Sequence, residues 1–531
     1  MGSLGVTGRG EAIGMNSRQT LVQFVFILAL AMLSGPTSAQ QTRPASASGR
    51  VSILLITVDD MNWDSPGCFG GAVPDITPNI DRMAAEGMRF TNAHVTIAVC
   101  TPSRSVLLTG MYPHHNGAEG FQRIRPDVPT LPAVLGEAGY LCGTIGKSLG
   151  QPEIFKWADE YGGPTQEGQG VFGRQPQVYY RFIRDFINKA NSKGCPFFIM
   201  ANSHDPHRPF HGSEKDRKLF HAPGSEVLDP SRIYKPNEIC VPGFLPDLPD
   251  VRTEVAQFYS SVRRADDTVG AILRALRESG EESNTLVMFL SDNGMSFPFA
   301  KSNCYLNSTR TPWIVRWPGR IKAGSVDREH FISGLDFMPT ALEVSGVAPT
   351  KKLDGVSFLP LLRGEDQANR DVVFTQYYHV HAGTPYPMRC VQSKRYGYIF
   401  NPWSNGEHLY NAEPLSGLTF AAMQKAAETD PAIRQRVRLL QYRCVEEFYD
   451  VEKDPSALHN LIADPRYTSP ADEMRQRLLK WMEQTGDVAI EAFRHRDSPA
   501  ALQQFMREYS AKAAREIQDL KEYEARTGYR F

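Results

Sequence analysis

The sequence predicts an α/β protein: a mostly parallel β-sheet flanked by helices, with a smaller C-terminal α+β subdomain that carries an antiparallel sheet. Three observations support this prediction. Apolar runs of strand length alternate with helical segments, which is typical of βαβ units and a sheet covered on both faces. Past about residue 365 the pattern changes to short strands and turns. The chain has 531 residues, which is too long for one small core.

The predicted strands of the parallel sheet are continuous β-branched and aliphatic runs, as expected for strands that are buried on both faces. They are residues 51–60 (VSILLITVDD), 140–147 (YLCGTIGK), 195–207 (CPFFIMANSHDPH, a strand and then a polar turn) and 285–294 (TLVMFLSDNG). Helices are expected between them, with proline at their starts or glycine at their ends. These helices are residues 78–87, 131–139 and the long amphipathic segment 254–280.

The C-terminal part is expected to contain short antiparallel strands within residues 371–380, 388–401 and 445–455, and a final helix that begins at Ser498 and Pro499. The expected division of the whole chain is a signal peptide (1–39), a linker (40–49), an N-terminal domain (50–365), a C-terminal subdomain (366–495) and a helical extension (496–531).

The N-terminus has the pattern of a secretory signal peptide. A basic flank at Arg18 precedes the apolar run FVFILALAML, and a small-x-small end follows at residues 37–39. The run is short for a membrane span, so no stable span is expected, and the alternative is a buried helix. We therefore expect an exported protein, which is periplasmic, secreted or lysosomal depending on the host. The net charge of −1 gives no global field that would favour nucleic acid.

Polar side chains follow four of the predicted strands. They are Asp59 and Asp60, Lys147, His204 and Asp205, and Asp292 and Asn293. Ligands of open α/β sheets bind beyond the carboxyl ends of the strands. The aspartates and the asparagine offer only oxygen ligands, which suit Ca²⁺ or Mg²⁺. Each pair alone is more often a turn cap, but two pairs at two strand ends favour a metal site.

The stretch CTPSRSVLLTG, residues 100–110, puts a cysteine at the start of a predicted helix. Pro102 suits the first helical turn, and Arg104 lies one turn after Cys100 on the same side. Helix N-termini favour anions and lower the pKa of a thiol, so a reactive Cys100 is expected. The alternative is an inert buried cysteine.

This stretch resembles the signature of the sulfatase family, which is Cys-x-Pro-Ser-Arg followed by Leu-Thr-Gly. The segments ITVDDMNWDSPGCFGG, LPAVLGEAGYLCGTIGKSLG, SHDPHRPF, LSDNGMSFPFAKSNCYLNSTRTP and EEFYDVEKDPSALHNL resemble further family segments in the same order, over roughly residues 50–490. HDPHRPF, SDNGMSFPFAKSNCY and YPMRCVQSKRYGYIFN are most similar to its heparan N-sulfatase branch. The resemblance implies an alkaline-phosphatase-like fold and an exported sulfatase that acts on a sulfated sugar.

The resemblance also implies a mechanism and its residues. Cys100 is oxidised to formylglycine (3-oxoalanine) by a formylglycine-generating system. The aldehyde hydrates to a diol, of which one hydroxyl, activated by Ca²⁺ (or Mg²⁺), attacks sulfur and displaces the alcohol or amine. The second hydroxyl then expels sulfate, which restores the aldehyde. The implied metal ligands are Asp59, Asp60, Cys100, Asp292 and Asn293. The implied catalytic groups are Cys100, Arg104 and Lys147 at the nucleophile and the sulfate, His204 as the acid for the leaving group, and Lys301 as a second sulfate clamp.

The sequence departs from the family pattern Gly-Lys-x-His at one position, where Leu149 replaces the histidine. Leucine cannot exchange a proton, so the release of sulfate from the enzyme is in question. His114, His115 or His207 could substitute for the missing histidine.

The expected substrate is a sulfated carbohydrate, with the N-sulfate of glucosamine in heparan-type glycans as the leading choice. Arg389, His379 and His381 in the C-terminal part are the candidate substrate-binding residues; the alternative for Arg389 is a structural ion pair. The alternative functions are an O-sulfatase for another glycan and a catalytically impaired protein that binds sulfated glycans. No nucleic acid partner is expected, and a homodimer remains open.

Overall fold

The computed structural model describes residues 49–147, 149–161, 173–221, 227–380 and 383–528. The predicted signal peptide and nearly all of the linker lie outside these residues. Among the helices in the described ranges, none combines the length and the apolar composition needed to cross a membrane.

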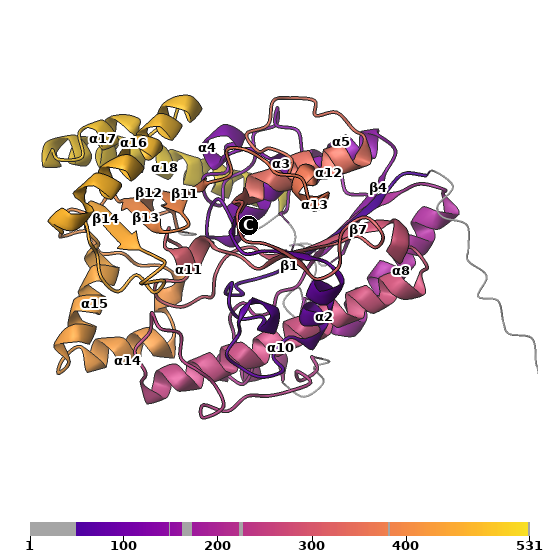
Figure 1. The fold of residues 1–531 in the computed structure, drawn as a ribbon, viewed down its shortest axis with the longest axis horizontal. Coiled ribbons are helices and arrows are strands. Elements are labelled where there is room, and N and C mark those ends of the chain that lie inside the picture. The colour runs from indigo at the N-terminus through magenta and orange to yellow at the C-terminus, as the bar shows by residue number, and fades with distance from the viewer. Residues whose placement is uncertain (1–48, 148, 162–172, 222–226, 381–382, 529–531) are drawn as a thin grey trace, which may run out of the picture. The chain divides into compact units, whose positions relative to one another are not determined.

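A large, mostly parallel sheet forms the centre of the N-terminal part (Figure 1), as predicted. In spatial order its strands are β5 (Asp159–Tyr161), β4 (Leu141–Gly146), β6 (Phe197–Asn202), β1 (Ser52–Val58), β7 (Thr285–Ser291), β8 (Trp313–Arg316), β2 (Met88–Phe90) and β9 (Ser325–Asp327). The first five strands in this order are parallel, β8 is antiparallel to both of its neighbours, and β9 is parallel to β2. The short strands β3 (Ala93–His94) and β10 (Ile332–Ser333) pair with each other.

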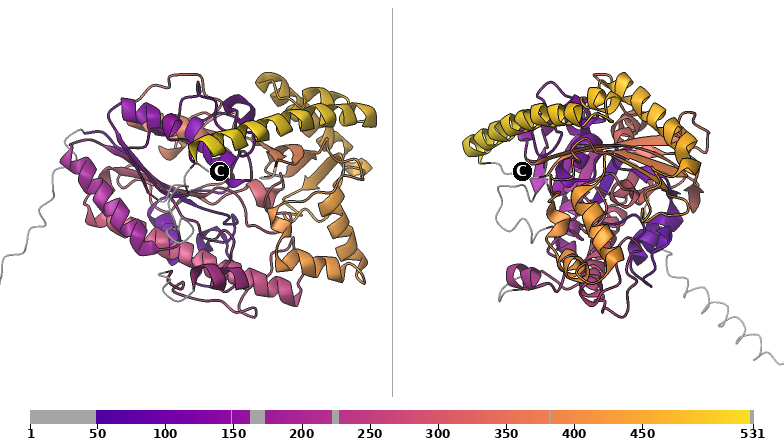
Figure 2. Two further views of the ribbon diagram at one scale, coloured as in Figure 1. Left: turned by 180° about the vertical axis from the view of Figure 1, so that it is seen from behind. Right: turned by 90° about the vertical axis from the view of Figure 1, so that its left-hand side faces the viewer.

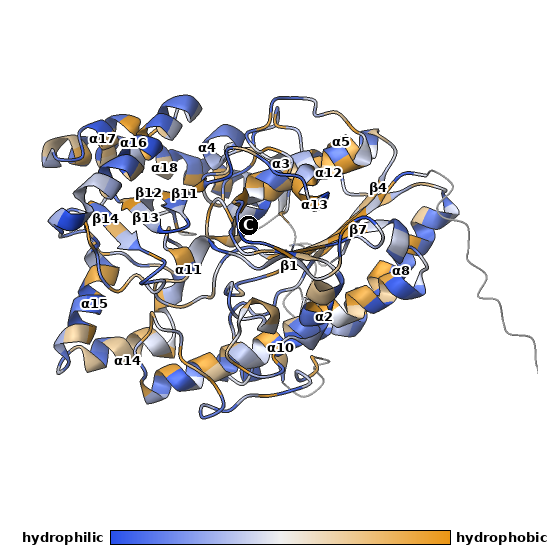
Figure 3. Ribbon diagram, viewed as in Figure 1, coloured by the Kyte–Doolittle hydropathy of each residue, from blue (hydrophilic) through white to orange (hydrophobic). Residues whose placement is uncertain are grey.

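Helices cover both faces of this sheet, because alternate side chains of each strand point to opposite faces. Ile56 of β1 belongs to a core with α2 (Pro78–Glu86), α8 (Pro176–Ser192) and α10 (Pro249–Glu278). Leu55 belongs to a second core with α3 (Cys100–Thr109), α5 (Leu131–Glu137) and α12 (Phe337–Ser345). In Figure 3, α10 carries both hydrophilic and hydrophobic residues along its length, as an amphipathic covering helix does.

Short helices complete the N-terminal part. The α-helices are α4 (Pro113–Asn116), α6 (Pro152–Phe155), α9 (Glu214–Phe220), α11 (Leu306–Thr309) and α13 (Leu359–Leu362), and the 3₁₀ turns are η1 (Gly67–Phe69), η2 (Glu282–Asn284) and η3 (Gly334–Asp336). The long helix starts five residues before the predicted segment 254–280, at Pro249, because proline is well suited to the first helical turn.

The C-terminal part carries the predicted antiparallel sheet. Its strands, in spatial and chain order, are β11 (Val372–His379), β12 (Pro385–Ser393), β13 (Tyr396–Phe400) and β14 (Glu446–Asp450). Around it lie η4 (Glu413–Leu415), α14 (Leu418–Ala426), α15 (Pro431–Tyr442), η5 (Pro465–Tyr467), α16 (Thr468–Thr485), α17 (Ile490–Arg494) and α18 (Pro499–Thr527). The last helix begins as predicted, with the Ser498 side chain accepting the N–H of Ala501.

Helix α18 returns to the N-terminal part instead of ending within the C-terminal one. It is the long yellow helix in Figure 2. Lys512 of α18 donates to Glu119 Oε1 at 2.8 Å, and the Tyr509 hydroxyl donates to Glu119 Oε2 at 2.9 Å. Further along, the Tyr523 hydroxyl donates to Glu153 Oε1 at 3.2 Å. The terminal helix therefore joins the two parts of the chain.

Candidate active site

Two pairs of polar residues meet at the carboxyl edge of the large sheet. Asp59 and Asp60 follow β1, and Asp292 and Asn293 follow the adjacent parallel strand β7. All four are fully buried. The backbone N–H of Asp60 donates to Asp292 Oδ1 at 3.2 Å, and Asn293 Nδ2 donates to Asp60 Oδ1 at 2.6 Å. The structure therefore brings four of the five predicted metal ligands together.

Helix α3 brings Cys100 and Arg104 to the same place. Cys100 is the first residue of the helix and is 6% exposed. Arg104, one turn on, is fully buried and donates to Asp292 Oδ2 at 2.9 Å, Thr57 Oγ1 at 2.7 Å and Asn202 Oδ1 at 2.6 Å. The guanidinium thus ties α3 to the ends of three strands.

The Cys100 thiol does not have the lowered pKa that its place at a helix N-terminus predicts. Burial raises the pKa of this thiol, and the nearby carboxylates of Asp59 and Asp292 add to the effect, while Lys147 and Lys301 oppose it. The prediction of an activated thiol is therefore wrong, because desolvation outweighs the helix dipole and the two ammonium groups. Cys100 is a neutral thiol in the unmodified chain.

Two lysines pair with the two consecutive aspartates. Lys147 Nζ lies 2.5 Å from Asp59 Oδ2, and Lys301 Nζ lies 2.8 Å from Asp60 Oδ2. Gly146 has a φ of +88°, and a Cβ there would lie 2.0 Å from the carbonyl oxygen of Asn202, so only glycine lets β4 deliver Lys147 at this point. The carboxylates raise the pKa of both lysines despite burial, so both are cations.

The oxygen atoms of the site fit a hard divalent cation. Asp59 Oδ1 and Asn293 Oδ1 are buried and have no hydrogen-bond partner among the described residues. Burial raises the pKa of Asp60 and of Asp292 to about 7. Burial acts the same way on Asp59, but Lys147 and other nearby cations hold its pKa well below the usual value. Buried oxygens without a partner, and carboxylates that are costly to ionise without a cation, are features of a site for Ca²⁺ or Mg²⁺.

Two histidines lie at this edge. His204, which follows β6, is half-buried, and burial together with the Lys147 charge lowers its pKa to about 3. His207 Nε2 lies 3.9 Å from Asp60 Oδ2 and 3.6 Å from Glu413 Oε1, and burial lowers its pKa to about 4. Both imidazoles are neutral near pH 7, so His204 is not a ready acid until a bound anion raises its pKa.

Sequence reasoning missed Glu413, the start of η4 in the C-terminal part. Its Oε2 accepts a hydrogen bond from Lys301 Nζ at 2.5 Å. Lys301 therefore lies between Asp60 and Glu413, one carboxylate from each part of the chain. The segment NAEPLSG around Glu413 has no motif that could have indicated this role.

The two predicted substrate-binding residues within the described ranges, Arg389 and His379, are buried. Arg389 is fully buried and pairs with Asp487 at 2.6 Å, so its guanidinium is not available to a substrate. His379 is 1% exposed, and its Nε2 lies 2.6 Å from Gln122 Nε2. His381 lies outside the described residues. The structure does not support the prediction that Arg389 and His379 bind substrate, and it favours the structural alternative for Arg389.

Leu149 is 6% exposed and belongs to the core that contains α5. Of the three candidate replacements for a histidine there, His114 Nε2 and His115 Nε2 lie 3.2 and 2.8 Å from the carbonyl oxygen of Thr485 in the C-terminal part. Of these three histidines, only His207 lies beside Asp60.

Comparisons with known proteins show which sequences this chain resembles. Residues 52–347 match the family described as Sulfatase, and residues 295–412 match the one described as N-sulphoglucosamine sulphohydrolase, C-terminal. The chain is 30% identical to human N-sulphoglucosamine sulphohydrolase over 470 residues, which cover 82% of this chain and 90% of the relative. It is 29% identical to an ulvan-active sulfatase of Formosa agariphila, with 90% and 91% covered.

The fold also matches solved structures. One is of a protein in complex with its substrate D-glucosamine-2-N,6-O-disulfate, with a TM-score of 0.62, 19% identity and coverage of 82% of this chain and 98% of the other.

Proposed function

This chain belongs to the sulfatase family, and we propose that it removes the N-sulfate of a terminal glucosamine in heparan-type glycans. The observation that carries the proposal is the position of Cys100, at the start of α3 and beside the ends of β1 and β7. Lys147 and Lys301, both cations, lie close enough to affect the pKa of its thiol. Positive charges at that place would stabilise the negative charge on sulfate oxygens in a transition state.

The proposal includes two groups that the chain must acquire. Asp59, Asp60, Asp292 and Asn293 would hold Ca²⁺ or Mg²⁺ with the side chain at position 100. A formylglycine-generating system would convert Cys100 to formylglycine during export. Together, these two groups would supply an activated oxygen nucleophile. The chain's own residues have other tasks: Arg104 anchors α3 to Asp292, and Lys147 and Lys301 would hold the sulfate.

The leaving group sets a further requirement. An amine leaves poorly unless it receives a proton, so cleavage of a sulfamate needs an acid near the nitrogen. His204 is the candidate, since it stands next to Lys147 at the strand ends. The negative charge of a bound sulfamate would raise its pKa from about 3. An aryl sulfate, whose phenolate leaves unaided, would not need this proton.

The choice of an N-sulfated sugar is supported by the human relative and by the C-terminal family match. Relatives described as an ulvan-active sulfatase and as N-acetylglucosamine-6-O-sulfatase favour an O-sulfatase as the second candidate. The loss of the family histidine at Leu149 favours a third, an impaired enzyme that retains glycan binding.

The test has two parts. Mass spectrometry of the peptide that contains Cys100, from protein made in its native host, should show formylglycine; an unmodified thiol in active protein would contradict the proposal. Sulfate release is then measured from N-sulfoglucosamine, glucosamine 6-sulfate and a 2-sulfated uronate. Preference for either O-sulfated sugar would overturn the N-sulfatase assignment alone. Binding without release from any sugar would identify the impaired enzyme.

The variant His204→Ala tests whether His204 is the acid for the leaving group. It should reduce sulfamate cleavage about 10²-fold or more, the usual contribution of a general acid. Cleavage of an aryl sulfate should fall much less. Equal losses on both substrates would show that His204 is not the acid for the leaving group.

A further inference from the structure

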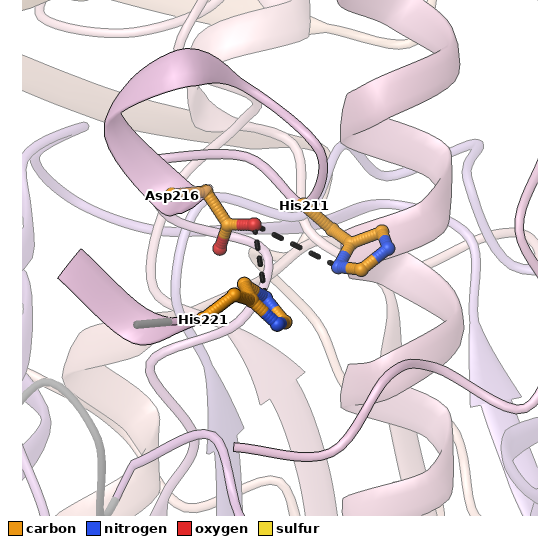
Figure 4. Close-up of side chains that lie close together, drawn as sticks. All are labelled: His211, Asp216 and His221. Carbon is orange, nitrogen blue, oxygen red and sulfur yellow. Dashed lines mark ion pairs between the residues drawn. The ribbon is translucent and has the colours of Figure 1, made fainter. Parts of the chain in front are cut away.

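A second cluster of potential metal ligands lies on the segment that follows the active-site histidines. His211, Asp216 and His221 point toward one another around α9 (Figure 4). Their nearest ligand atoms all lie within 4.8 Å of one another. His221 Nε2 is 3.2 Å and His211 Nδ1 is 3.8 Å from Asp216 Oδ2.

Three polar atoms of this cluster have no hydrogen-bond partner among the described residues. Asp216 is fully buried and His211 is 7% exposed. His211 Nδ1, Asp216 Oδ1 and His221 Nε2 are buried and accept or donate no hydrogen bond within the described residues. Asp216 Oδ2 accepts the backbone N–H of Gly212 at 2.9 Å, and Asp216 Oδ1 lies 4.0 Å from Arg264 Nη2. Buried polar atoms left unpaired are unfavourable, so the two unpartnered imidazole nitrogens, which both face Asp216 Oδ2, indicate a missing ligand.

A fourth side chain, the exposed carboxylate of Asp229, faces the other ring nitrogens of the two histidines. Across the cluster, Asp229 Oδ1 lies 3.8 Å from His211 Nε2 and 3.9 Å from His221 Nδ1. A carboxylate that faces the second nitrogen of a metal-binding imidazole is the usual outer partner of such a ligand.

We propose that His211, Asp216 and His221 form a three-ligand site for a divalent transition metal, of which Zn²⁺ suits the donors best. Two imidazoles and one carboxylate match the ligands of zinc, whereas the oxygen-only site at the strand ends matches Ca²⁺ or Mg²⁺. Zinc bonds of about 2.0–2.2 Å place tetrahedral ligands roughly 3.3–3.5 Å apart. The two histidine–aspartate separations, 3.2 and 3.8 Å, are close to this range, and the ligand atoms of the two histidines lie within 4.8 Å of each other.

This metal would fix one wall of the active site. The chain runs from His207 directly to His211, whose backbone N–H donates to Ser261 Oγ of α10 at 2.8 Å. Asp205, next to His204, pairs with Arg264 of α10 at 2.7 Å. A metal bound to His211 and Asp216 would therefore hold α9 against the segment that positions the two active-site histidines.

The test uses the full chain without a histidine tag, stripped with a chelator and saturated with Ca²⁺ before titration with Zn²⁺ or Co²⁺. We expect one Zn²⁺ per chain by elemental analysis, a tetrahedral Co²⁺ absorption spectrum and a Tm that rises on Zn²⁺ addition. His211→Ala and His221→Ala should each weaken Zn²⁺ binding at least about 100-fold. Asp229→Asn, an exposed and conservative change, should weaken it about 10- to 100-fold.

Two controls separate this site from others. His330 also lies between two carboxylates, but both of its ring nitrogens are within 2.8 Å of them, so His330→Ala should leave Zn²⁺ binding unchanged. Asp292→Ala should remove Ca²⁺ and leave Zn²⁺ in place, which keeps the result independent of the sulfatase proposal. Wild-type protein that binds no Zn²⁺, or equal Zn²⁺ binding by the His221→Ala variant, would overturn the inference.

Discussion

Lys301 Nζ donates a hydrogen bond to Glu413 Oε2 at 2.5 Å, and this contact links the C-terminal part of the chain to the candidate metal site. The same ammonium pairs with Asp60 at 2.8 Å. Lys301 is 1% exposed, so it depends on both carboxylates to compensate its buried charge. Folding of the C-terminal part is therefore needed to set the electrostatics of the site.

We expect Glu413→Gln to destabilise the protein at pH 7 by about 1 kcal/mol. The loss should be smaller than for a fully buried charged hydrogen bond, because the Glu413 side chain is 37% exposed. Burial would raise the pKa of Glu413, but Lys301 and His207 hold it well below the usual value. A carboxylate whose pKa is lower in the folded state than in the unfolded state stabilises the protein at pH values above its unfolded-state pKa. This stabilisation is lost as the pH falls through the folded-state pKa.

The difference in Tm between wild type and Glu413→Gln should therefore shrink as the pH is lowered from 7 toward 3. Glu428, an exposed glutamate on the same part of the chain, provides the control Glu428→Gln, for which no difference is expected. A Tm difference that grows on acidification would contradict the assignment.

Cys100→Ala should abolish turnover, by about 10³-fold or more, because it removes the side chain that is converted to the nucleophile. The fold should persist, since the change removes one buried sulfur atom. Cys142→Ala is the matched control: Cys142 is 2% exposed in β4, so this variant should lose similar stability and no activity. Turnover by natively expressed Cys100→Ala would contradict the role of position 100.

Asp292→Ala should lose both the divalent metal and activity. It also removes the carboxylate that Arg104 contacts at 2.8 Å, and breaking such a buried pair costs about 3–5 kcal/mol. Asp292→Asn keeps the shape of the side chain, so it should cost less stability. It should still weaken metal binding. Elemental analysis and sulfate release are measured on both variants. Full activity after verified metal removal from wild type would refute the metal requirement.

Strand ends could be predicted well because they follow from local pattern. Apolar runs indicate β1 and β7, and the carboxyl ends of parallel strands lie at one edge of a sheet, so the sequence predicts that Asp59 and Asp292 meet there. Pairing between remote segments could not be predicted. Glu413 and Asp487 have no local signal, because their roles arise only when the chain has folded around Lys301 and Arg389.

Arg389 illustrates how such pairing misleads sequence reasoning. An arginine near a predicted cleft suggests anion binding, but Arg389 pairs with Asp487 within the C-terminal part, and neither is exposed to solvent. We expect Arg389→Ala to destabilise the protein by about 3–5 kcal/mol, with little change in KM for the folded fraction. Asp487→Asn should lose less stability, since it leaves a polar partner. A raised KM with unchanged Tm would instead support a substrate-binding role.

The last prediction concerns sulfate release. Leu149 stands where the family has a histidine. Among the described residues, His207 lies beside Asp60 and could replace the missing histidine as the base. Its pKa of about 4 leaves the imidazole neutral near pH 7, so it can accept a proton as a base. If His207 serves this role, the first turnover and the steady state should proceed at similar rates in wild type.

His207→Ala should then produce a burst of desulfated product followed by a slow phase, because the sulfated enzyme would accumulate. His114→Ala is the control, since His114 contacts the C-terminal part instead of the aspartates. Stopped-flow measurement of desulfated sugar separates the two phases. A burst already present in wild type would show that nothing replaces the missing histidine, and a burst-free His207→Ala with fast turnover would show that His207 is not the base.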